Sequence, residues 1–185
     1  MAAMGTTTRR CAGFTLLEAL VVMAVLGILL TLAVPAVSAL RQQHQMQAQA
    51  EGLLDSLLLA RSEALRRQQR VTVCVRGTDA VCDLAGGWQQ GWLVFEDLNH
   101  NALHDPGEGL IEVHPALPST LRLVGKTTVN GYMSYSPEGR SVTRNGAFLA
   151  GTLSLCHVQL AQGWQLVINA LGKPRLQKYT PTACS

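Results

Sequence analysis

The chain has 185 residues, five cysteines and a formal net charge of +3. This length fits one domain plus an anchor, and the sequence has no internal repeats or low-complexity segments, which excludes a repeat array. The charge is unevenly distributed, because residues 71–121 have one basic and seven acidic side chains, whereas residues 122–185 have seven basic and one acidic. The last third, at +6, is therefore where an anionic partner would bind.

The N-terminal part is dominated by an apolar run. From Ala19 to Leu40, 22 residues follow one another without a charge. At about 1.5 Å per residue they form a helix of roughly 33 Å, enough to cross a bilayer. Arg9 and Arg10 precede the run on the side that should stay cytoplasmic. Glu18 lies at its start, where a carboxylate is costly and usually has a partner.

Residues 13–18, Gly-Phe-Thr-Leu-Leu-Glu, together with the apolar run resemble the leader of a type IV prepilin. The resemblance implies that a prepilin peptidase cuts between Gly13 and Phe14, so that residues 1–13 are removed. It also implies N-methylation of Phe14 and a role in assembly for Glu18, whose carboxylate would meet the N-terminal amine of a neighbouring subunit. Pro35 falls where pilins often have a helix-kinking proline.

Two simpler interpretations exist for this region. A secretory signal peptide cut after Ala39 would release a soluble domain, but signal sequences have about 7–15 apolar residues and this run is longer. An uncleaved membrane anchor is the other alternative. Neither accounts for the early Glu18.

After a transmembrane half over residues 14–40, an amphipathic half is predicted over residues 41–70. Leu53, Leu57, Ala60 and Ala64 recur at helical spacing, which indicates one face packed on a globular domain. The helix should end near Arg70, because the next residues are β-branched and alternate. Anchor and domain would therefore share one long helix.

Residues 71–185 are predicted to form a periplasmic β domain. Turn residues separate eight short β-prone segments, at 71–75, 92–95, 110–113, 121–124, 132–136, 151–156, 164–169 and 175–178. A long helix followed only by strands predicts an α+β fold in which an antiparallel sheet packs on the helix.

Several motifs resemble the minor pilin FimT and pseudopilin GspH family. They are Ala-Arg-Ser-Glu-Ala at 60–64, Val-Thr-Val-Cys at 71–74, Trp-x-x-Gly-Trp-x-Val-Phe at 88–95 and Ser-Pro-Glu-Gly-Arg at 136–140. The resemblance implies a pilin fold. It also implies a subunit of a type IV pilus or type II secretion filament rather than an enzyme.

Cysteine usage predicts disulfides. Cys11 would be lost with the leader, which leaves an even number of cysteines in a domain facing the periplasm. The four are Cys74, Cys82, Cys156 and Cys184. Three connectivities are possible, and we favour Cys74–Cys82 with Cys156–Cys184, because each closes a short segment.

No catalytic motif, cofactor motif or zinc site is evident, and we expect neither an enzyme nor a bound cofactor. One loop does have calcium-ligand spacing, with oxygen side chains at positions 1, 3, 5, 9 and 12. They are Asp97, Asn99, Asn101, Asp105 and Glu108. Ala102 stands where such loops have glycine, Pro106 is stiff, and flanking helices are not expected. A turn rich in Asn and Asp is the favoured interpretation, and no bound metal is predicted.

The C-terminal stretch Gly172-Lys173-Pro174-Arg175, with Lys178, is a candidate DNA contact. It is similar to the Gly-Arg-x-Arg motif of FimT-type minor pilins that bind DNA, although Lys173 replaces an arginine and lacks its bidentate fork. The alternative is a hairpin turn whose charges face water.

The sequence thus predicts a single-pass inner-membrane protein with a periplasmic domain, which later enters a pilus or pseudopilus. Its expected partners are the prepilin peptidase, other pilin or pseudopilin subunits, the inner membrane and, in the alternative, double-stranded DNA.

Overall fold

The structure is a computed structural model that describes residues 15–182 and residue 184, without the side chains of residues 32–36 and 127. The proposed cleavage and methylation residues Gly13 and Phe14 lie outside the described part. So does the side chain of Pro35. Two compact units divide the chain, Met1–Gln42 and Gln43–Ser185, and the helix α1 (Leu16–Arg67) belongs to both.

Unit 1 contains the first part of α1. The helix begins after Thr15, whose hydroxyl oxygen accepts a hydrogen bond from the backbone N–H of Glu18 at 3.2 Å. A threonine three residues before a glutamate is the pattern of a capping box, in which side chains satisfy the free N–H groups of the first turn. The large apolar side chains that the structure describes in this unit are all exposed, from 45% for Val22 to 82% for Leu16.

Among the helices formed by described residues, none is both long enough and apolar enough to cross a membrane. The predicted span of residues 14–40 includes Phe14, which lies outside the described residues. The transmembrane assignment therefore stays a prediction.

In unit 2 the remaining part of α1 has one fully buried stripe. The buried residues recur every three or four positions and are 0–3% exposed: Met46, Ala50, Leu53, Leu57, Ala60 and Ala64. The helix ends at Arg67, and Gln68 then takes a positive φ of 55° while its side-chain amide donates to the carbonyl of Leu65 at 2.8 Å. The predicted amphipathic helix is confirmed, and it ends two to three residues earlier than expected.

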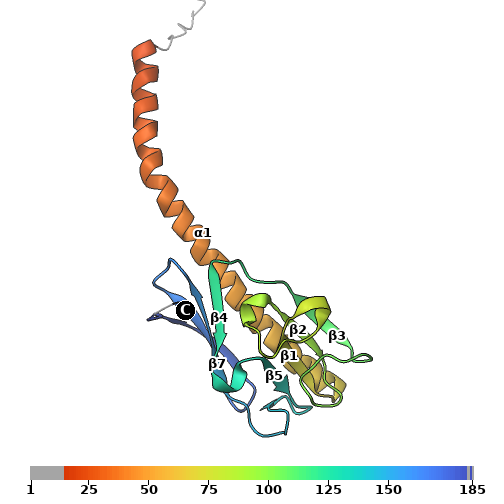
Figure 1. Cartoon of the computed structure of the whole chain (residues 1–185). Helices are drawn as coiled ribbons and strands as arrows, with labels where there is room; N and C mark the ends of the chain where they lie inside the picture. The colour runs from red at the N-terminus through yellow and green to blue at the C-terminus, as the bar shows by residue number, and fades with distance from the viewer. Residues whose placement is uncertain (1–14, 183, 185) are drawn as a thin grey trace, which may run out of the picture. The chain divides into compact units, whose positions relative to one another are not determined.

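In the part of the chain that the structure describes, nine strands form two antiparallel sheets (Figure 1). The first has the order β3-β2-β1-β5-β6 and the second the order β4-β7-β8-β9. Their bounds are β1 Val71–Val75, β2 Trp92–Glu96, β3 Leu110–His114, β4 Leu121–Gly125, β5 Tyr132–Tyr135, β6 Ser141–Val142, β7 Gly151–His157, β8 Gly163–Ile168 and β9 Pro174–Tyr179. Short 3-10 helices occupy Thr78–Ala80 (η1), Trp88–Gln90 (η2) and Thr127–Val129 (η3).

Both sheets contribute to one core with α1. The central strand β1 alternates, so that Val71, Val73 and Val75 join this core, while Cys74 faces a smaller cluster on the opposite side with Leu93 and Phe95. Because both faces of β1 are covered, all five of its residues are buried.

The structure confirms all eight predicted strands to within about one residue at each end. Two features differ from the expectation. The strands divide into two sheets instead of one, and the two-residue strand β6 was missed because so short a segment has no detectable period. It pairs with β5 across the Ser136–Arg140 turn.

Candidate functional sites

The first candidate site is Glu18, in the first turn of α1. Its backbone N–H is bound by Thr15, as described above, and a carboxylate suits the positive end of a helix. Within the part of the chain that the structure describes, no basic side chain pairs with this carboxylate. The capping contact is therefore made by the Thr15 hydroxyl, and the Glu18 side chain is exposed.

Cys74, Cys82, Cys156 and Cys184 form the two disulfides favoured from the sequence. Cys74 and Cys82 are bridged with Cα atoms 5.7 Å apart, and so are Cys156 and Cys184. The first bond closes the short loop containing η1, and the second ties the end of the chain to β7. Both lie in unit 2, where they restrict the unfolded chain.

Three polar contacts attach the second part of α1 to the strands. The indole N–H of Trp92 donates to the hydroxyl of Ser56 at 2.9 Å, and that hydroxyl lies 2.9 Å from a carboxylate oxygen of Glu112. Arg61 donates through Nε to the carbonyl of Gly139 at 2.8 Å. These residues were not singled out from the sequence, because their partners lie far away in the chain.

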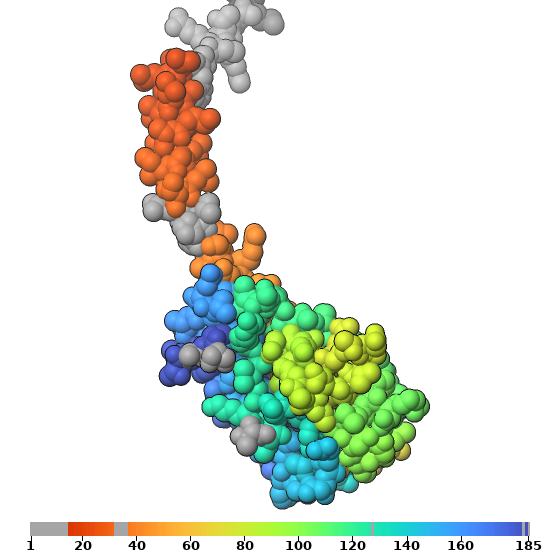
Figure 2. Space-filling view, in the orientation of Figure 1, coloured from red at the N-terminus to blue at the C-terminus, as the bar shows by residue number. Residues whose placement is uncertain are grey.

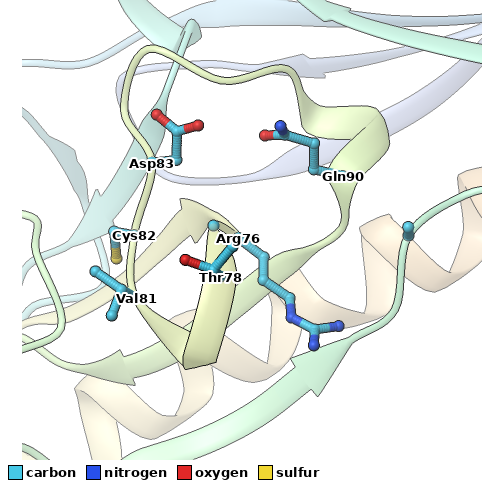
Figure 3. A pocket seen from close by; sticks show the side chains of 8 residues that line it. Arg76, Thr78, Val81, Cys82, Asp83 and Gln90 are labelled. Atoms are coloured by element: carbon cyan, nitrogen blue, oxygen red, sulfur yellow. The ribbon is translucent and has the colours of Figure 1, made fainter.

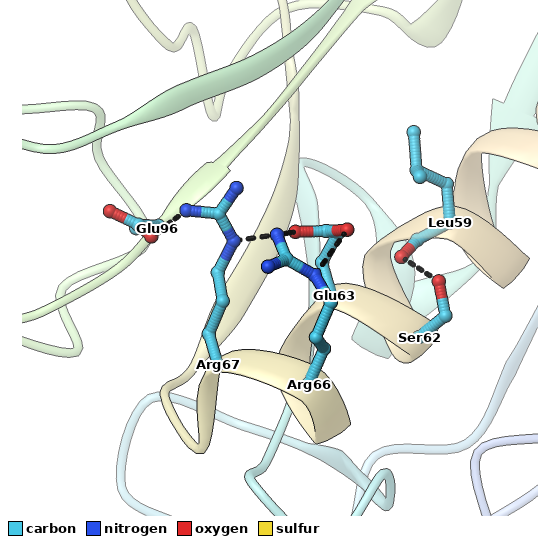
Figure 4. A network of polar contacts seen from close by, with 6 residues as sticks. All are labelled: Leu59, Ser62, Glu63, Arg66, Arg67 and Glu96. Carbon is cyan, nitrogen blue, oxygen red and sulfur yellow. Dashed lines mark hydrogen bonds and ion pairs between the residues drawn. The ribbon is translucent and has the colours of Figure 1, made fainter.

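A network of charged side chains lies at the C-terminal end of α1 and joins it to β2 (Figure 4). Arg66 and Arg67 both donate to Glu63, and Arg67 also reaches Glu96 on β2. The hydrogen bond from Arg66, followed by that from Arg67, lowers the pKa of Glu63 from 4.5 to about 2. Ion pairs near the surface contribute little to stability, so this network mainly orients the helix end on the sheet.

An open cleft of about 660 Å³ lies beside the first disulfide (Figure 3). It is lined by Arg76, Thr78, Val81, Asp83 and Gln90, together with Gly77, Cys82 and Ala116. Cys82 is bonded to Cys74 and so cannot act as a nucleophile. Among the lining residues, Asp83 is the one carboxylate, and it has no second acid or base beside it in the lining. Its Oδ1 accepts a hydrogen bond from the backbone N–H of Ala85.

The C-terminal candidates lie on β9, an edge strand, and on the turn before it. Gly172 has a φ of +74°, and a Cβ there would lie 2.3 Å from the carbonyl oxygen of Gly139, so only glycine fits. The backbone N–H of Lys173 is held by Asn169 at 3.1 Å. Lys173, Arg175 and Lys178 all have exposed side chains.

Arg175 and Lys178 point to opposite faces of the sheet. Residues three apart on a strand alternate, and Lys178 shares the face of Leu176, which packs against the core. The ammonium of Lys178 lies 5.4 Å from the centre of the Trp164 ring. Lys173 and Arg175 are therefore placed to contact one ligand together, whereas Lys178 faces the other side of the sheet.

The loop that joins β2 to β3 contains the calcium-spaced residues. Asn99 and Asn101 both donate to Oδ2 of Asp105, at 2.8 and 2.7 Å, and these bonds lower the pKa of Asp105. Within the described residues, no group of three or more His, Cys, Asp or Glu side chains is arranged to hold a metal ion. The segment is a series of bends and turns between β2 and β3.

The fold is that of a pilin-like protein. Its helix is apolar and exposed at the beginning and has a buried stripe later, and it is followed by a disulfide-bonded domain of antiparallel strands. Two family models match the chain. The description of the first is "Type II transport protein GspH", over residues 49–172, and that of the second is "Prokaryotic N-terminal methylation motif", over residues 8–34. The chain belongs to the GspH family of type II transport proteins.

A curated relative and two solved structures are also similar to this chain. The pilin-like protein PilA1 of Thermus thermophilus is 39% identical over 107 residues, which is 58% of this chain and 60% of the relative. The chain therefore matches less than two thirds of the length of that relative.

The minor pilin FimU of Pseudomonas aeruginosa has a TM-score of 0.56 at 19% identity, covering 78% of this chain and 98% of FimU. The minor pseudopilin EpsH of the type 2 secretion system of Vibrio cholerae has a TM-score of 0.50 at 13% identity, and the match covers 75% of this chain and 98% of EpsH. At these identities the likeness shows the fold alone. The predicted class, a structural protein like a minor pilin or pseudopilin, is confirmed by the family match.

Proposed function

We propose that the chain is made as a prepilin, is cut between Gly13 and Phe14 by a prepilin peptidase, and is methylated on the new N-terminus. It then resides in the inner membrane and assembles with other pilin or pseudopilin subunits through the first part of α1. The observation that carries this proposal is the exposure of apolar side chains on unit 1.

The apolar side chains of unit 1 lie on every side of the helix. Leu20, Val21, Val22 and Met23 occupy four consecutive positions, about 100° apart, and are 45–71% exposed. A helix that is hydrophobic all round is stable only in a membrane or inside a bundle of helices. Burying one such side chain contributes about 1.5–3 kcal/mol, so a lipid phase and a helical filament core are both favourable destinations.

Glu18 gives the assembly step its specificity in this proposal. In an apolar environment its carboxylate needs a positive partner, and the described part of the chain supplies none. The methylated amine of a neighbouring subunit would satisfy it. Each subunit would then enter in register with the one before it.

Processing is tested by Gly13→Val, because a side chain before the cut should clash in the peptidase. We expect a full-length species to remain in the membrane, whereas normal cleavage would contradict the leader assignment. Assembly is tested by Glu18→Gln, which keeps the side-chain volume. The variant should be cleaved and inserted but depleted from sheared filaments, and the control Glu51→Gln, at an exposed position of the same helix, should be incorporated normally.

DNA capture is a second candidate function, favoured by the C-terminal turn. Lys173 and Arg175 are exposed, and residues 122–185 contain seven basic side chains but only one acidic side chain. The turn is presented rigidly, since Gly172 packs against Gly139 and Asn169 holds the backbone of Lys173. Cations on a defined edge of a sheet are suited to phosphate contacts that do not read sequence.

The DNA proposal is tested by titrating the protein with duplex DNA across salt concentrations. The double variant Lys173→Gln/Arg175→Gln should weaken binding and reduce the slope of log affinity against log salt by about two units, at about 0.9 per lost contact. The charge-matched control Arg122→Gln/Lys126→Gln changes the opposite edge of the same sheet. Equal effects of the two double variants would indicate attraction by net charge and would count against this site.

A further inference from the structure

The loop over residues 97–108 contains an unexplained buried oxygen. Asp97 is fully buried, and its Oδ1 atom has no hydrogen-bond partner among the described residues. The other oxygen, Oδ2, accepts the hydroxyl of Thr72 at 2.7 Å and the backbone N–H of Ala102 at 3.2 Å. The carboxylate is thus held between Thr72 on β1 and the backbone of the loop. A buried oxygen of this kind usually has a water or an ion as its partner.

The backbone of the loop is shaped like a calcium loop. Ala102 is the sixth residue counted from Asp97, where such loops make a sharp turn and normally have glycine. Here Ala102 takes the left-handed conformation, with a φ of 61°, and its N–H is held by Asp97. The backbone therefore makes the required turn with alanine in place of glycine.

The oxygen side chains of the loop are also oriented. Oδ1 of Asn99 accepts the N–H of Asn101, and Oδ1 of Asn101 accepts the N–H of Leu103. Each amide oxygen has a second lone pair that can bind a cation. The amide groups of both residues gather on Asp105, so side chains from positions 3, 5 and 9 already meet at one carboxylate oxygen.

Glu108, the twelfth residue, is held by two backbone donors. Its Oε1 accepts the N–H of Leu98 at 2.8 Å, and its Oε2 accepts the N–H of Asp105 at 3.0 Å. Both oxygens keep a lone pair, and the two bonds fix the direction of the carboxylate, as hydrogen-bonded supports do for metal ligands.

We propose that residues 97–108 bind one calcium ion. The ligands are the side-chain oxygens of Asp97, Asn99, Asn101, Asp105 and Glu108, with the carbonyl of Leu103 at the seventh position. Among the described residues, the acidic side chains of Asp97, Asp105 and Glu108 are not already gathered into a metal group. The proposal therefore requires the loop to draw them together around the ion, with the two amide oxygens and the carbonyl as further ligands. Oxygen ligands of this number suit calcium, whereas magnesium prefers to keep several of its waters.

Charge and position are consistent with an ion from the surrounding medium. Residues 71–121 have a net charge of −6. Leu98, Asn99 and His100 are exposed, and the segment around residue 100 is at the surface of unit 2 (Figure 2). Calcium sites of extracellular modules have dissociation constants of about 10⁻⁴–10⁻³ M, and a similar affinity is expected here. The bound ion would hold the connection between β2 and β3 in one conformation.

The test is calorimetric titration of the full chain in detergent, after removal of calcium with a chelator, using calcium chloride as the probe. The wild type should bind one calcium ion per chain, and magnesium at the same concentration should not displace it. Glu108→Gln should weaken the affinity at least tenfold. Asp79→Asn, which removes an exposed acid from the neighbouring loop, should bind calcium like the wild type.

Folding is monitored by circular dichroism, and Asp105→Asn serves as a second variant if Glu108→Gln is unfolded. The proposal is overturned if the wild type shows no saturable calcium binding up to about 10 mM, above the range of known extracellular sites. It is also overturned if magnesium competes equally, or if a folded Glu108→Gln variant binds calcium as the wild type does.

Discussion

The two parts of α1 both contain leucines, but those leucines have opposite surroundings. In unit 1, Leu20 and Leu26 are 63% and 48% exposed, whereas in unit 2 Leu53 and Leu57 are 2% and 0% exposed. The later part is stabilised by strands of its own chain. The earlier part lacks such a cover among the described residues, and in the proposed function lipid or other subunits would cover its apolar surface. One helix therefore serves folding at one end and, as proposed, assembly at the other.

The largest expected effect comes from a matched pair of leucines. Leu57→Ala should lower the free energy of unfolding by up to about 5 kcal/mol, because it leaves a cavity in the shared core. Leu26→Ala should leave it unchanged, since that side chain is exposed. Urea unfolding of the full chain in detergent, followed by tryptophan fluorescence, measures both. Similar losses would mean that the two parts of α1 are not energetically distinct.

Removal of each disulfide should destabilise unit 2 to a different degree. Cys156 and Cys184 are 28 residues apart and Cys74 and Cys82 are 8 apart. The chain-entropy relation then gives losses of about 3.6 and about 2.5 kcal/mol on replacement of each pair by alanine. Membrane insertion of unit 1 should be unaffected in both variants. Thermal unfolding gives the ranking, and a reversed order would show that burial of Cys74 outweighs loop length.

The smallest expected effect is a pH dependence at the end of α1. The folded pKa of Glu63, about 2, lies below its ordinary value of 4.5, so its stabilisation is complete above about pH 4.5 and is lost as the pH falls toward 2. Because the network lies at the surface and Arg66 is 63% exposed, solvent screens it and the loss should be at most about 1 kcal/mol.

Glu63→Gln should remove this part of the acid sensitivity, whereas Asp55→Asn, at an exposed position of the same helix, should retain it. The comparison is made by urea unfolding between pH 2 and pH 6. An unchanged pH profile in Glu63→Gln would assign the acid sensitivity to other carboxylates.

Local patterns in the sequence determined much of this protein. The apolar run, the stripe from Leu53 to Ala64 and the eight β-prone segments each depend on residues close together in the chain, so their periodicity was sufficient. The resemblance of residues 13–18 and of the later motifs to pilins indicated the family. The cysteine spacing indicated the pairing, because the bridges that close short segments were the ones formed.

Only the tertiary structure decided the features that depend on distant partners. Pairing between strands determined the division into two sheets and the existence of β6. One oxygen of the buried Asp97 has no hydrogen-bond partner among the described residues. The carbonyl oxygen of Gly139 lies so close to Gly172 that only glycine fits there. The alternation of β9 separated Lys178 from Arg175. Periodicity reports which residues of an element share a face, but the neighbours that cover that face come from remote parts of the chain and are set by the packing of the whole fold.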